Sequence, residues 1–140
     1  MDDMANLDLA YAPPFSTAIS NVAHSANIIR NKIDGLVEAI SPRMLKEKIL
    51  QKNDFVLVDV RSRQEVEKSP IKAVEVLHIP QDELHSIINE VPKDKEIIVG
   101  CQIGLRSYDS LRAAFVGAGC SNVKFLDGGW HVWFGCGYDG

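Results

Sequence analysis

The chain has 140 residues, a hydrophobic content of 46%, a charged content of 24% and a net charge of −4, which are the values of one ordinary globular domain. It has neither a long basic block nor an apolar run of about 18 residues, so we expect no nucleic-acid partner and no membrane partner. Its acidic start does not resemble a signal peptide, and three cysteines without a C-x-x-C pair do not suggest a disulfide framework. We therefore expect a cytoplasmic protein.

Residues 1–35 differ in composition from the rest of the chain. Pro13 and Pro14 stop a short strand-like piece, and a helix-like stretch follows from about Ser20 to Ile33, with Gly35 as its expected stop. A segment of about 35 residues is too small to hold a hydrophobic core of its own. It must pack on another element or stay loose.

From Ile40 onward, helical and strand patterns alternate. Ser41 and Pro42 predict a helix start, as N-cap and first helical residue. The apolar and amphipathic patterns predict helices at 43–51, 81–91 and 106–119, and strands at 55–60, 73–80, 96–100 and 122–127. This alternation indicates a small parallel α/β sheet, in which ligands bind beyond the carboxyl ends of the strands. Cys101 lies at such an end, as do Asp59 and Arg61.

The residues around Cys101 have features that would stabilise a thiolate. A helix is expected directly after the loop, and the N–H groups at its start carry partial positive charge. Gly100 and Gly104 permit turns that direct backbone amides inward, and Arg106 adds a permanent cation. Ile103 and Leu105, however, are apolar. The loop alone leaves two interpretations open, a reactive cysteine and a buried structural one.

The number of residues between Cys101 and Arg106 favours one class of substrate over another. Cysteine-based phosphatases resemble one another in a C-x5-R loop sized for a tetrahedral phosphate, whereas the spacing here is C-x4-R. One residue fewer makes a tighter ring of amides. This favours a smaller anion on the cysteine, such as the terminal sulfur of a persulfide.

Four blocks of sequence resemble the rhodanese family, in the right order and at the right separations. They are "VLVDVRSRQEVE", "LHIPQDEL", "KEIIVGCQIGLRS" and "GCSNVKFLDGGWHVW", and the resemblance covers about residues 40 to 134. It implies an α/β fold with a five-stranded parallel sheet and helices on both faces, a domain over residues 36–140, and sulfurtransferase activity. One block departs from the family, because Ser69-Pro70-Ile71 stands where a Gly-His-Ile element is usual, which affects a wall of the site.

The resemblance implies that Cys101 is the nucleophile and accepts sulfane sulfur as a persulfide. The backbone amides of residues 102 to 106 would stabilise that sulfur, so the expected binding residues are Gln102, Ile103, Gly104, Leu105 and Arg106. Arg106 would also orient an anionic donor. The expected substrates are small sulfur donors, thiosulfate or a persulfide, and the expected acceptors are thiols.

Residues 1–35 resemble the end of the dimerisation domain of flavin-dependent coenzyme A-disulfide reductases and related persulfide reductases. Some of those enzymes carry a rhodanese domain directly after this point. The chain is therefore expected to be the carboxyl-terminal piece of such a fusion, with a flavin reductase domain as a partner and residues 1–35 as an oligomerisation element. FAD and NAD are implied only for the full-length enzyme, and we expect this chain alone to bind neither.

The remaining chemistry-bearing residues have plainer interpretations. We expect Asp59 and Arg61 to form a salt-bridged structural support, with Glu65 joining them. Cys120 is expected to be a packing residue, and Cys136 a free tail cysteine or a resolving thiol. The histidines lack mutual metal-ligand spacing, so no metal site is expected. Trp130 and Trp133 are expected to cover the edge of the sheet.

Two further functions compete with sulfur transfer. A catalytically silent rhodanese-like module for binding or regulation is the first, and the presence of Cys101 disfavours it. Phosphatase or arsenate reductase chemistry is the second, and the C-x4-R spacing disfavours it.

Overall fold

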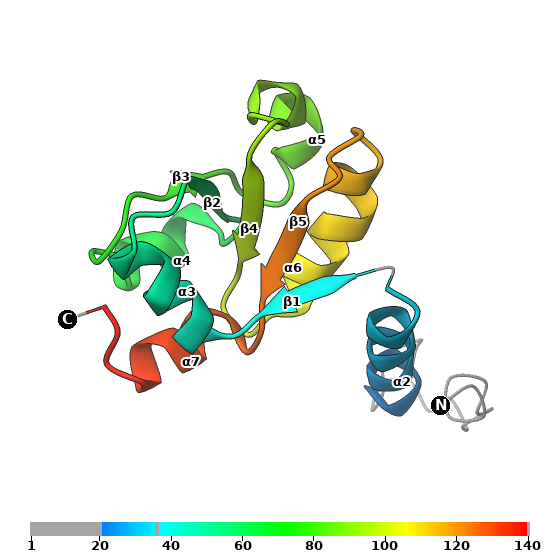
Figure 1. Cartoon of the computed structure of the whole chain (residues 1–140), viewed down its shortest axis with the longest axis horizontal. Helices are drawn as coiled ribbons and strands as arrows, with labels where there is room; N and C mark the ends of the chain where they lie inside the picture. Colours follow the sequence, from blue (N-terminus) through cyan, green and yellow to red (C-terminus); the bar gives the residue numbers. More distant parts are fainter. Residues whose placement is uncertain (1–20, 36, 140) are drawn as a thin grey trace. The chain divides into compact units, whose positions relative to one another are not determined.

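The computed structural model describes residues 21–35 and 37–139. The chain divides into two units, Met1–Val37 and Glu38–Gly140. In the described part of the first unit, helix α2 spans Asn21–Ile33, as the pattern predicted (Figure 1). The backbone then turns at Gly35, whose φ of 69° is one that glycine adopts without strain. The strand-like piece before Pro13 lies outside the described residues, as do residues 1–20 of the predicted oligomerisation element 1–35.

The second unit contains a five-stranded sheet in which every neighbouring pair is parallel, so the predicted fold class is confirmed. The spatial order of the strands is β1-β5-β4-β2-β3. Their bounds are β1 Glu38–Ile40, β2 Phe55–Asp59, β3 Leu77–His78, β4 Glu96–Gly100 and β5 Val123–Leu126. Because all strands run the same way, the carboxyl ends of β2 and β4 lie side by side, with Asp59 opposite Gly100. This edge is where ligands bind in parallel sheets.

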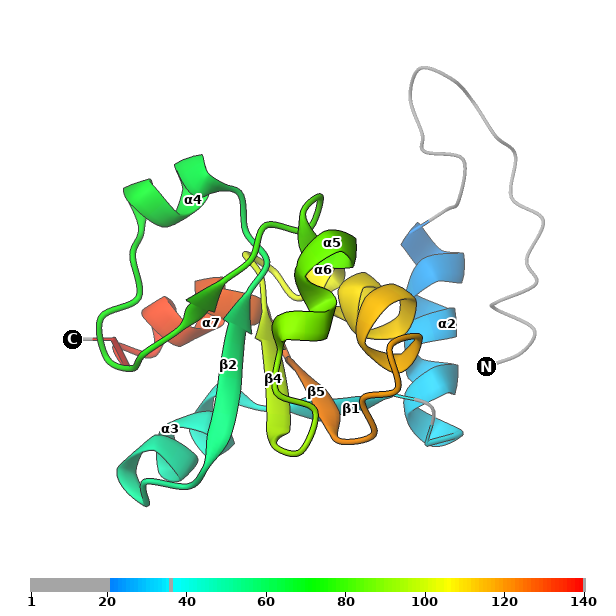
Figure 2. The same ribbon diagram turned by 90° about the horizontal axis from the view of Figure 1, so that it is seen from above.

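Helices cover both faces of the sheet. Figure 2 shows α3 and α7 on one side of it and α5 and α6 on the other. The helical bounds are α3 Pro42–Leu50, α4 Arg63–Lys68, α5 Leu84–Ile87 with the 3-10 turn η1 Ile88–Glu90, α6 Leu105–Ser110 with the π-helical η2 Leu111–Val116, and α7 Gly129–Gly135. Helix α3 begins as predicted, since Pro42 is its first residue and the Ser41 side chain accepts the Met44 N–H. None of the described helices is long and apolar enough to cross a membrane.

The core on the face with α3 and α7 is one hydrophobic cluster of residues from four strands and these two helices. Its buried members are Ile40, Leu45, Leu57, Ile98, Leu126, Trp130 and Trp133. The two tryptophan rings meet edge to face with centroids 6.2 Å apart, and neither is exposed. The expectation that they cover the edge of the sheet is therefore wrong, because α7 carries them across its face.

Several elements depart from the sequence pattern. Strand β3 is shorter than the predicted 73–80, because Val74 and Val76 pack against the hydrophobic cluster instead of pairing with β2.

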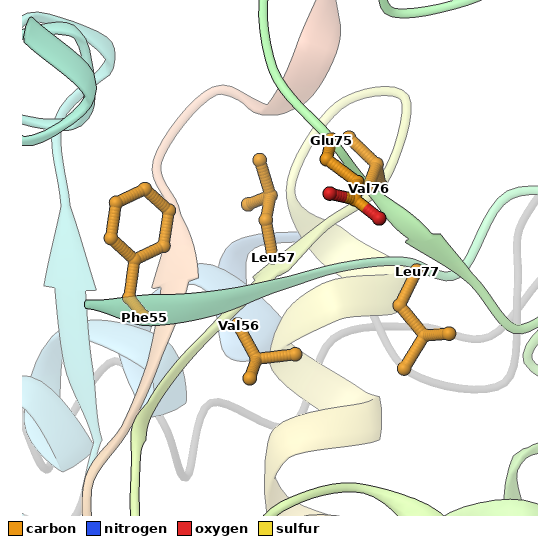
Figure 3. A pocket seen from close by; sticks show the side chains of 6 residues that line it. All are labelled: Phe55, Val56, Leu57, Glu75, Val76 and Leu77. Carbon is orange, nitrogen blue, oxygen red and sulfur yellow. The ribbon is translucent and has the colours of Figure 1, made fainter. Parts of the chain in front are cut away.

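A cavity of about 260 Å³ lies between the amino-terminal half of β2 and residues 75–77. Figure 3 shows Phe55 and Leu57 on one face of β2 and Val56 on the other, as expected for a strand covered on both sides. The cavity is not at the carboxyl ends of the strands, and we do not assign the site to it.

Candidate active site

The loop that carries Cys101 begins where β4 ends. Gly100 lies directly under the indole of Trp130, and a Cβ atom at this position would come within 2.5 Å of the ring. A side chain therefore cannot replace Gly100 without moving a fully buried tryptophan. The end of β4 is further fixed to β2, because Val60 donates its N–H to the Gly100 carbonyl at 2.9 Å. Cys101 thus follows a rigid strand end.

The sulfur of Cys101 is completely buried and contacts two hydrogen-bond donors. The backbone N–H of Gly104 donates to Sγ at 3.1 Å, and the hydroxyl Oγ of Ser107 lies 3.6 Å from it. The same hydroxyl lies 2.8 Å from the Gly104 carbonyl, so its single proton is donated either to that carbonyl or to the sulfur. Gly104 has a φ of 98°, a conformation that favours glycine, and this turn brings its amide under the sulfur. The arrangement can stabilise negative charge on sulfur.

Ser107 was missed by reasoning from the sequence. It lies six residues after Cys101 and in the first turn of α6, the helix that follows the loop. A serine in the first turn of a helix can direct its hydroxyl back toward the loop before that helix. The position of Ser107 in the sequence could therefore have indicated a contact with the Cys101 loop.

Helix α7 holds the loop from behind. The N–H groups of Trp130 and His131 donate to the carbonyls of Cys101 and Gln102 at 2.8 and 2.9 Å. Gly129 has a φ of 62°, and a Cβ atom there would come within 2.3 Å of the Cys101 carbonyl oxygen. The sequence pattern gave no role to the amides at the start of α7. These amides tie the loop to the sheet.

Most of the residues predicted to bind substrate have no hydrogen bond to the Cys101 sulfur in the described structure. In the described structure Gly104 is the residue of 102–106 whose amide is hydrogen-bonded to Sγ. Ile103 is 65% exposed and Leu105 is 39% exposed, while Gln102 is half-buried. Their roles stay predictions.

Arg106 is engaged by Glu65 through two hydrogen bonds. Its Nη1 donates to Oε2 at 2.8 Å and its Nη2 to Oε1 at 2.5 Å. The pKa of Glu65 is lowered to about 2, chiefly by the hydrogen bond from Arg106. The pKa of Arg106 is raised, mainly by the hydrogen bond to Glu65 and to a smaller extent by the charges of Glu65, Cys101 and Asp59.

Asp59 and Arg61 form a separate pair beneath the loop. Both side chains are buried, and the Arg61 guanidinium donates to the carboxylate at 2.8 to 3.1 Å. Arg61 also lies over the rings of Trp130 and Phe134, 6.0 Å from each centroid. The predicted support is thus formed by Asp59 and Arg61. The expectation that Glu65 joins it is wrong, because α4 directs Glu65 to Arg106.

Two open pockets border the loop and share no lining residue. One, of about 470 Å³, is lined by Val60, Ser62, Gln81, Asp82 and Arg106. The other, of about 570 Å³, is lined by Lys68, Ser69, Pro70, Lys72, Gln102, His131, Phe134, Gly137 and Asp139. Ser69 and Pro70 therefore stand in a wall beside the loop, at the place where the sequence departs from the family pattern.

The other two cysteines do not contact this site. Cys120 is buried, and burial raises the pKa of its thiol, as expected for a packing residue. Cys136 is exposed after α7, and all three cysteines are free. Within residues 21–35 and 37–139, no group of three or more His, Cys, Asp or Glu residues could hold a metal ion.

Comparison with known proteins identifies the family. The family model described as "Rhodanese-like domain" matches residues 41–136. The thiosulfate sulfurtransferase GlpE of Ectopseudomonas mendocina is 35% identical over 94 residues, 67% of this chain and 82% of that protein. A sulfurtransferase of Allochromatium vinosum is 29% identical over 98 residues, 70% of this chain and 89% of that protein.

Two solved structures resemble nearly the whole chain. Reduced CoADR-RHD of Bacillus anthracis is 34% identical with a TM-score of 0.78, and the NAD-dependent persulfide reductase of A. fulgidus is 44% identical with a TM-score of 0.73. The similarity covers 94% and 95% of this chain but only 22% of each of those proteins, so the chain spans about a fifth of their length. By its sequence, its sheet and the position of its loop, the chain belongs to the rhodanese-like domain family.

Proposed function

We propose that this chain is a sulfurtransferase domain in which Cys101 accepts sulfane sulfur as a persulfide and passes it to a thiol or to a reductase partner. The observation that carries the proposal is the surroundings of Sγ, which receives the Gly104 N–H at 3.1 Å and lies 3.6 Å from the Ser107 hydroxyl. Names of relatives support the same class of reaction, since two of them are sulfurtransferases.

The first half-reaction loads the cysteine. The thiolate of Cys101 attacks the outer sulfur of a donor R–S–SH, a bond forms between the two sulfurs, and the donor S–S bond breaks. Its electron pair leaves on R–S⁻, and Cys101–S–SH remains. Hydrogen-bond donors around Sγ favour this step because they stabilise the thiolate that attacks. No separate general base is needed once the thiol is ionised.

The second half-reaction returns the enzyme to its starting state. An acceptor thiolate R′–S⁻ attacks the outer sulfur of Cys101–S–SH and forms R′–S–SH, and Cys101 leaves as the thiolate. Sulfur is transferred without net oxidation or reduction. In a fusion with a flavin reductase, the acceptor would be a group of the reductase, and residues 1–35 would be the end of its dimerisation domain. The likeness to CoADR-RHD and to the persulfide reductase supports this arrangement, and a cytoplasmic location stays a prediction.

The decisive experiment measures loading of sulfur on Cys101. The protein is incubated with thiosulfate or polysulfide, and its intact mass and its cyanide-dependent formation of thiocyanate are measured. We expect a mass gain of one sulfur atom and turnover, both lost in Cys101→Ser. Cys120→Ser and Cys136→Ser are the matched controls, because they remove the other two free thiols.

Each competing function predicts a different result. A Cys101→Ser variant with full activity would refute the mechanism. Absence of sulfur uptake with retained folding would favour a silent binding module. Hydrolysis of an aryl phosphate without sulfur uptake would favour a phosphatase, although pairing of Arg106 with Glu65 leaves its guanidinium poorly placed to bind phosphate.

A further inference from the structure

We propose that Glu65 determines which sulfur donors the Cys101 loop accepts, because it holds the guanidinium of Arg106 and thereby disfavours donors with an anionic group next to the sulfane sulfur. The inference rests on the proposed function and concerns the class of donor. Thiosulfate, whose sulfane sulfur is bonded directly to a sulfonate, is the disfavoured kind. An organic persulfide with an uncharged body is the favoured kind.

Arg106 is the only Lys or Arg in the loop 101–106, so it is the cation that an anionic donor above Cys101 would meet first. Both of its terminal nitrogens are already bonded to Glu65, one to each carboxylate oxygen, at 2.8 and 2.5 Å. A two-point contact of this kind is the geometry in which a guanidinium binds carboxylate most strongly. A sulfonate could take this two-point position on Nη1 and Nη2 only by displacing Glu65.

Glu65 is itself held in place by helix α4. It is the third residue of the helix and forms a capping box with Ser62, accepting the backbone N–H and the hydroxyl of Ser62 at 2.9 Å each. Its carboxylate is therefore fixed from the helix side before it meets Arg106. About a third of each side chain of the Glu65–Arg106 pair is exposed.

The surroundings of Arg106 do not supply a replacement cation. Among the described residues that line the pocket beside it, Arg106 is the only cation, and Asp82 adds a negative charge. Arg61 lies buried and engaged with Asp59. Glu65, Asp82 and Arg106 together carry one net negative charge on this side of the loop, and the nearby Arg63 is paired with Glu83. An anionic donor that enters here is repelled rather than attracted.

Loading of Cys101 by thiosulfate and loading by an organic persulfide differ in the negative charge that they bring to the loop. Thiosulfate is a dianion, and its attack by the Cys101 thiolate brings three negative charges together. A Cys101–S–S⁻ bond forms while the donor S–S bond breaks, and sulfite leaves with the electron pair and two negative charges. When R is uncharged and the donor reacts in its protonated form R–S–SH, the reaction carries a single negative charge throughout. A loop without an available cation therefore favours the second donor.

The lysines of the second pocket offer the competing route for an anion. Lys68 and Lys72 line the pocket that Gln102 borders, on the side that shares no lining residue with the Arg106 pocket. If thiosulfate were bound by these lysines, the state of Arg106 would not matter. The test must therefore distinguish binding of thiosulfate in the Arg106 pocket from binding in the Lys68 and Lys72 pocket.

The test compares two donors on Glu65→Gln. A glutamine keeps the capping box, since its amide oxygen can still accept the Ser62 N–H, but it removes the charge that holds Arg106. The donors are thiosulfate and the persulfide of 2-mercaptoethanol, which carries no ionisable group besides its sulfur. The rate of sulfur loading on Cys101 is followed by intact mass over a range of donor concentrations. We expect the ratio of the second-order loading rate constant for thiosulfate to that for the persulfide to rise about tenfold.

Matched variants identify the cause of that rise. Glu83→Gln removes the same charge from the exposed pair of Glu83 with Arg63 and should leave the ratio unchanged. Glu65→Gln combined with Arg106→Gln should abolish the gain, because the freed guanidinium is its source. Glu65→Asp, which retains the charge, should keep the ratio near that of the unaltered protein. If Glu65→Gln folds poorly, Glu65→Met removes the charge with a side chain of similar length and is tested in the same way.

The outcomes are distinct. An unchanged ratio in a folded neutral variant of Glu65 that still loads sulfur from the persulfide would overturn the inference but not the proposed function. A fall in thiosulfate loading in Lys68→Gln or Lys72→Gln, without any effect of Glu65→Gln, would also overturn it and place anionic donors on the Gln102 side. If neither donor loads Cys101 in the unaltered protein, the proposed function itself fails.

Discussion

Two arginine–carboxylate pairs lie near the Cys101 loop, and they differ mainly in their access to solvent. Asp59 and Arg61 are 2% and 0% exposed, whereas Glu65 and Arg106 are 33% and 35% exposed. A buried pair cannot be opened without leaving a charge in a low-dielectric interior, so it acts as a fixed support. A half-exposed pair can be opened at modest cost, and a change at Glu65 can therefore alter binding without unfolding the domain.

The two pairs also differ in what surrounds them. Arg61 lies over two aromatic rings, and its backbone carbonyl is hydrogen-bonded to His78 Nε2 at 2.8 Å. The Nη1 atom of Arg61 has no hydrogen-bond partner among the described residues. Glu65 and Arg106 instead border an open pocket beside the loop. We therefore expect the first pair to contribute mainly to stability, and we propose donor selection only for the second.

The largest expected effect comes from breaking the buried pair. Asp59→Asn keeps the shape of the side chain but leaves the Arg61 cation without a counter-charge. We expect the free energy of unfolding to fall by about 3 to 5 kcal/mol, measured by urea denaturation. Replacing both partners, with Asp59→Asn and Arg61→Met, should recover part of that loss. A fall below about 1 kcal/mol in Asp59→Asn would mean that this pair behaves like a surface pair.

An intermediate effect is expected at the opposite end of the sheet. Glu96 begins β4 and accepts from Lys48 at 2.7 Å and from Lys124 at 2.8 Å, with its side chain 11% exposed. Burial works to raise the pKa of Glu96, but the hydrogen bonds from the two lysines outweigh it and leave that pKa below its usual range. We expect Glu96→Gln to lower the free energy of unfolding by about 1 to 2 kcal/mol, measured by thermal or urea denaturation.

Glu38→Gln is the matched control for Glu96. Glu38 contacts the same Lys124 at 3.5 Å but is 67% exposed, so its removal should cost only a few tenths of a kcal/mol, on the order expected for surface pairs. Equal losses in the two variants would show that burial does not set the strength of these pairs.

The smallest expected effect is the pH dependence of the Glu65 pair. The pKa of the Glu65 carboxyl is lowered from 4.5 to about 2 in the folded protein. The ion pair with Arg106 therefore stabilises the fold fully above about pH 5 and loses this stabilisation as the pH falls toward 2. Near pH 7, Glu65→Gln should reduce the free energy of unfolding by at most about 1 kcal/mol relative to the unaltered protein. This difference should shrink near about pH 3. A difference that grew on acidification would contradict the assignment.

Much of the fold could be predicted because its signal is local. The runs that form β2 and β4 are continuously apolar, and in β4 Ile97, Ile98 and Val99 are completely buried, as a central parallel strand requires. Ser41 and Pro42 marked the start of α3 for reasons contained within one turn of helix. The short elements β1 and α4 were not predicted, because three to six residues carry too little periodicity to be recognised.

The carboxyl-terminal helix was missed for a different reason. Residues 129–135 begin with glycine and include two tryptophans, a composition with weak helix propensity. Helix α7 is stabilised by tertiary contacts, because Trp130 and Trp133 are buried in the core and the first amides of the helix bond to the Cys101 loop.

Reading the residues alone was enough to place Cys101 after an apolar run and four residues before Arg106. Cys101 follows a buried strand, and the spacing to Arg106 is a property of the chain alone. Only the tertiary structure decided that Arg106 bonds to Glu65, a residue 41 positions away, and that Ser107 and the Gly104 amide meet at Sγ. Hydrophobic periodicity is read from neighbouring residues, whereas the partner of a charge depends on which of the 19 acidic residues the fold brings within reach.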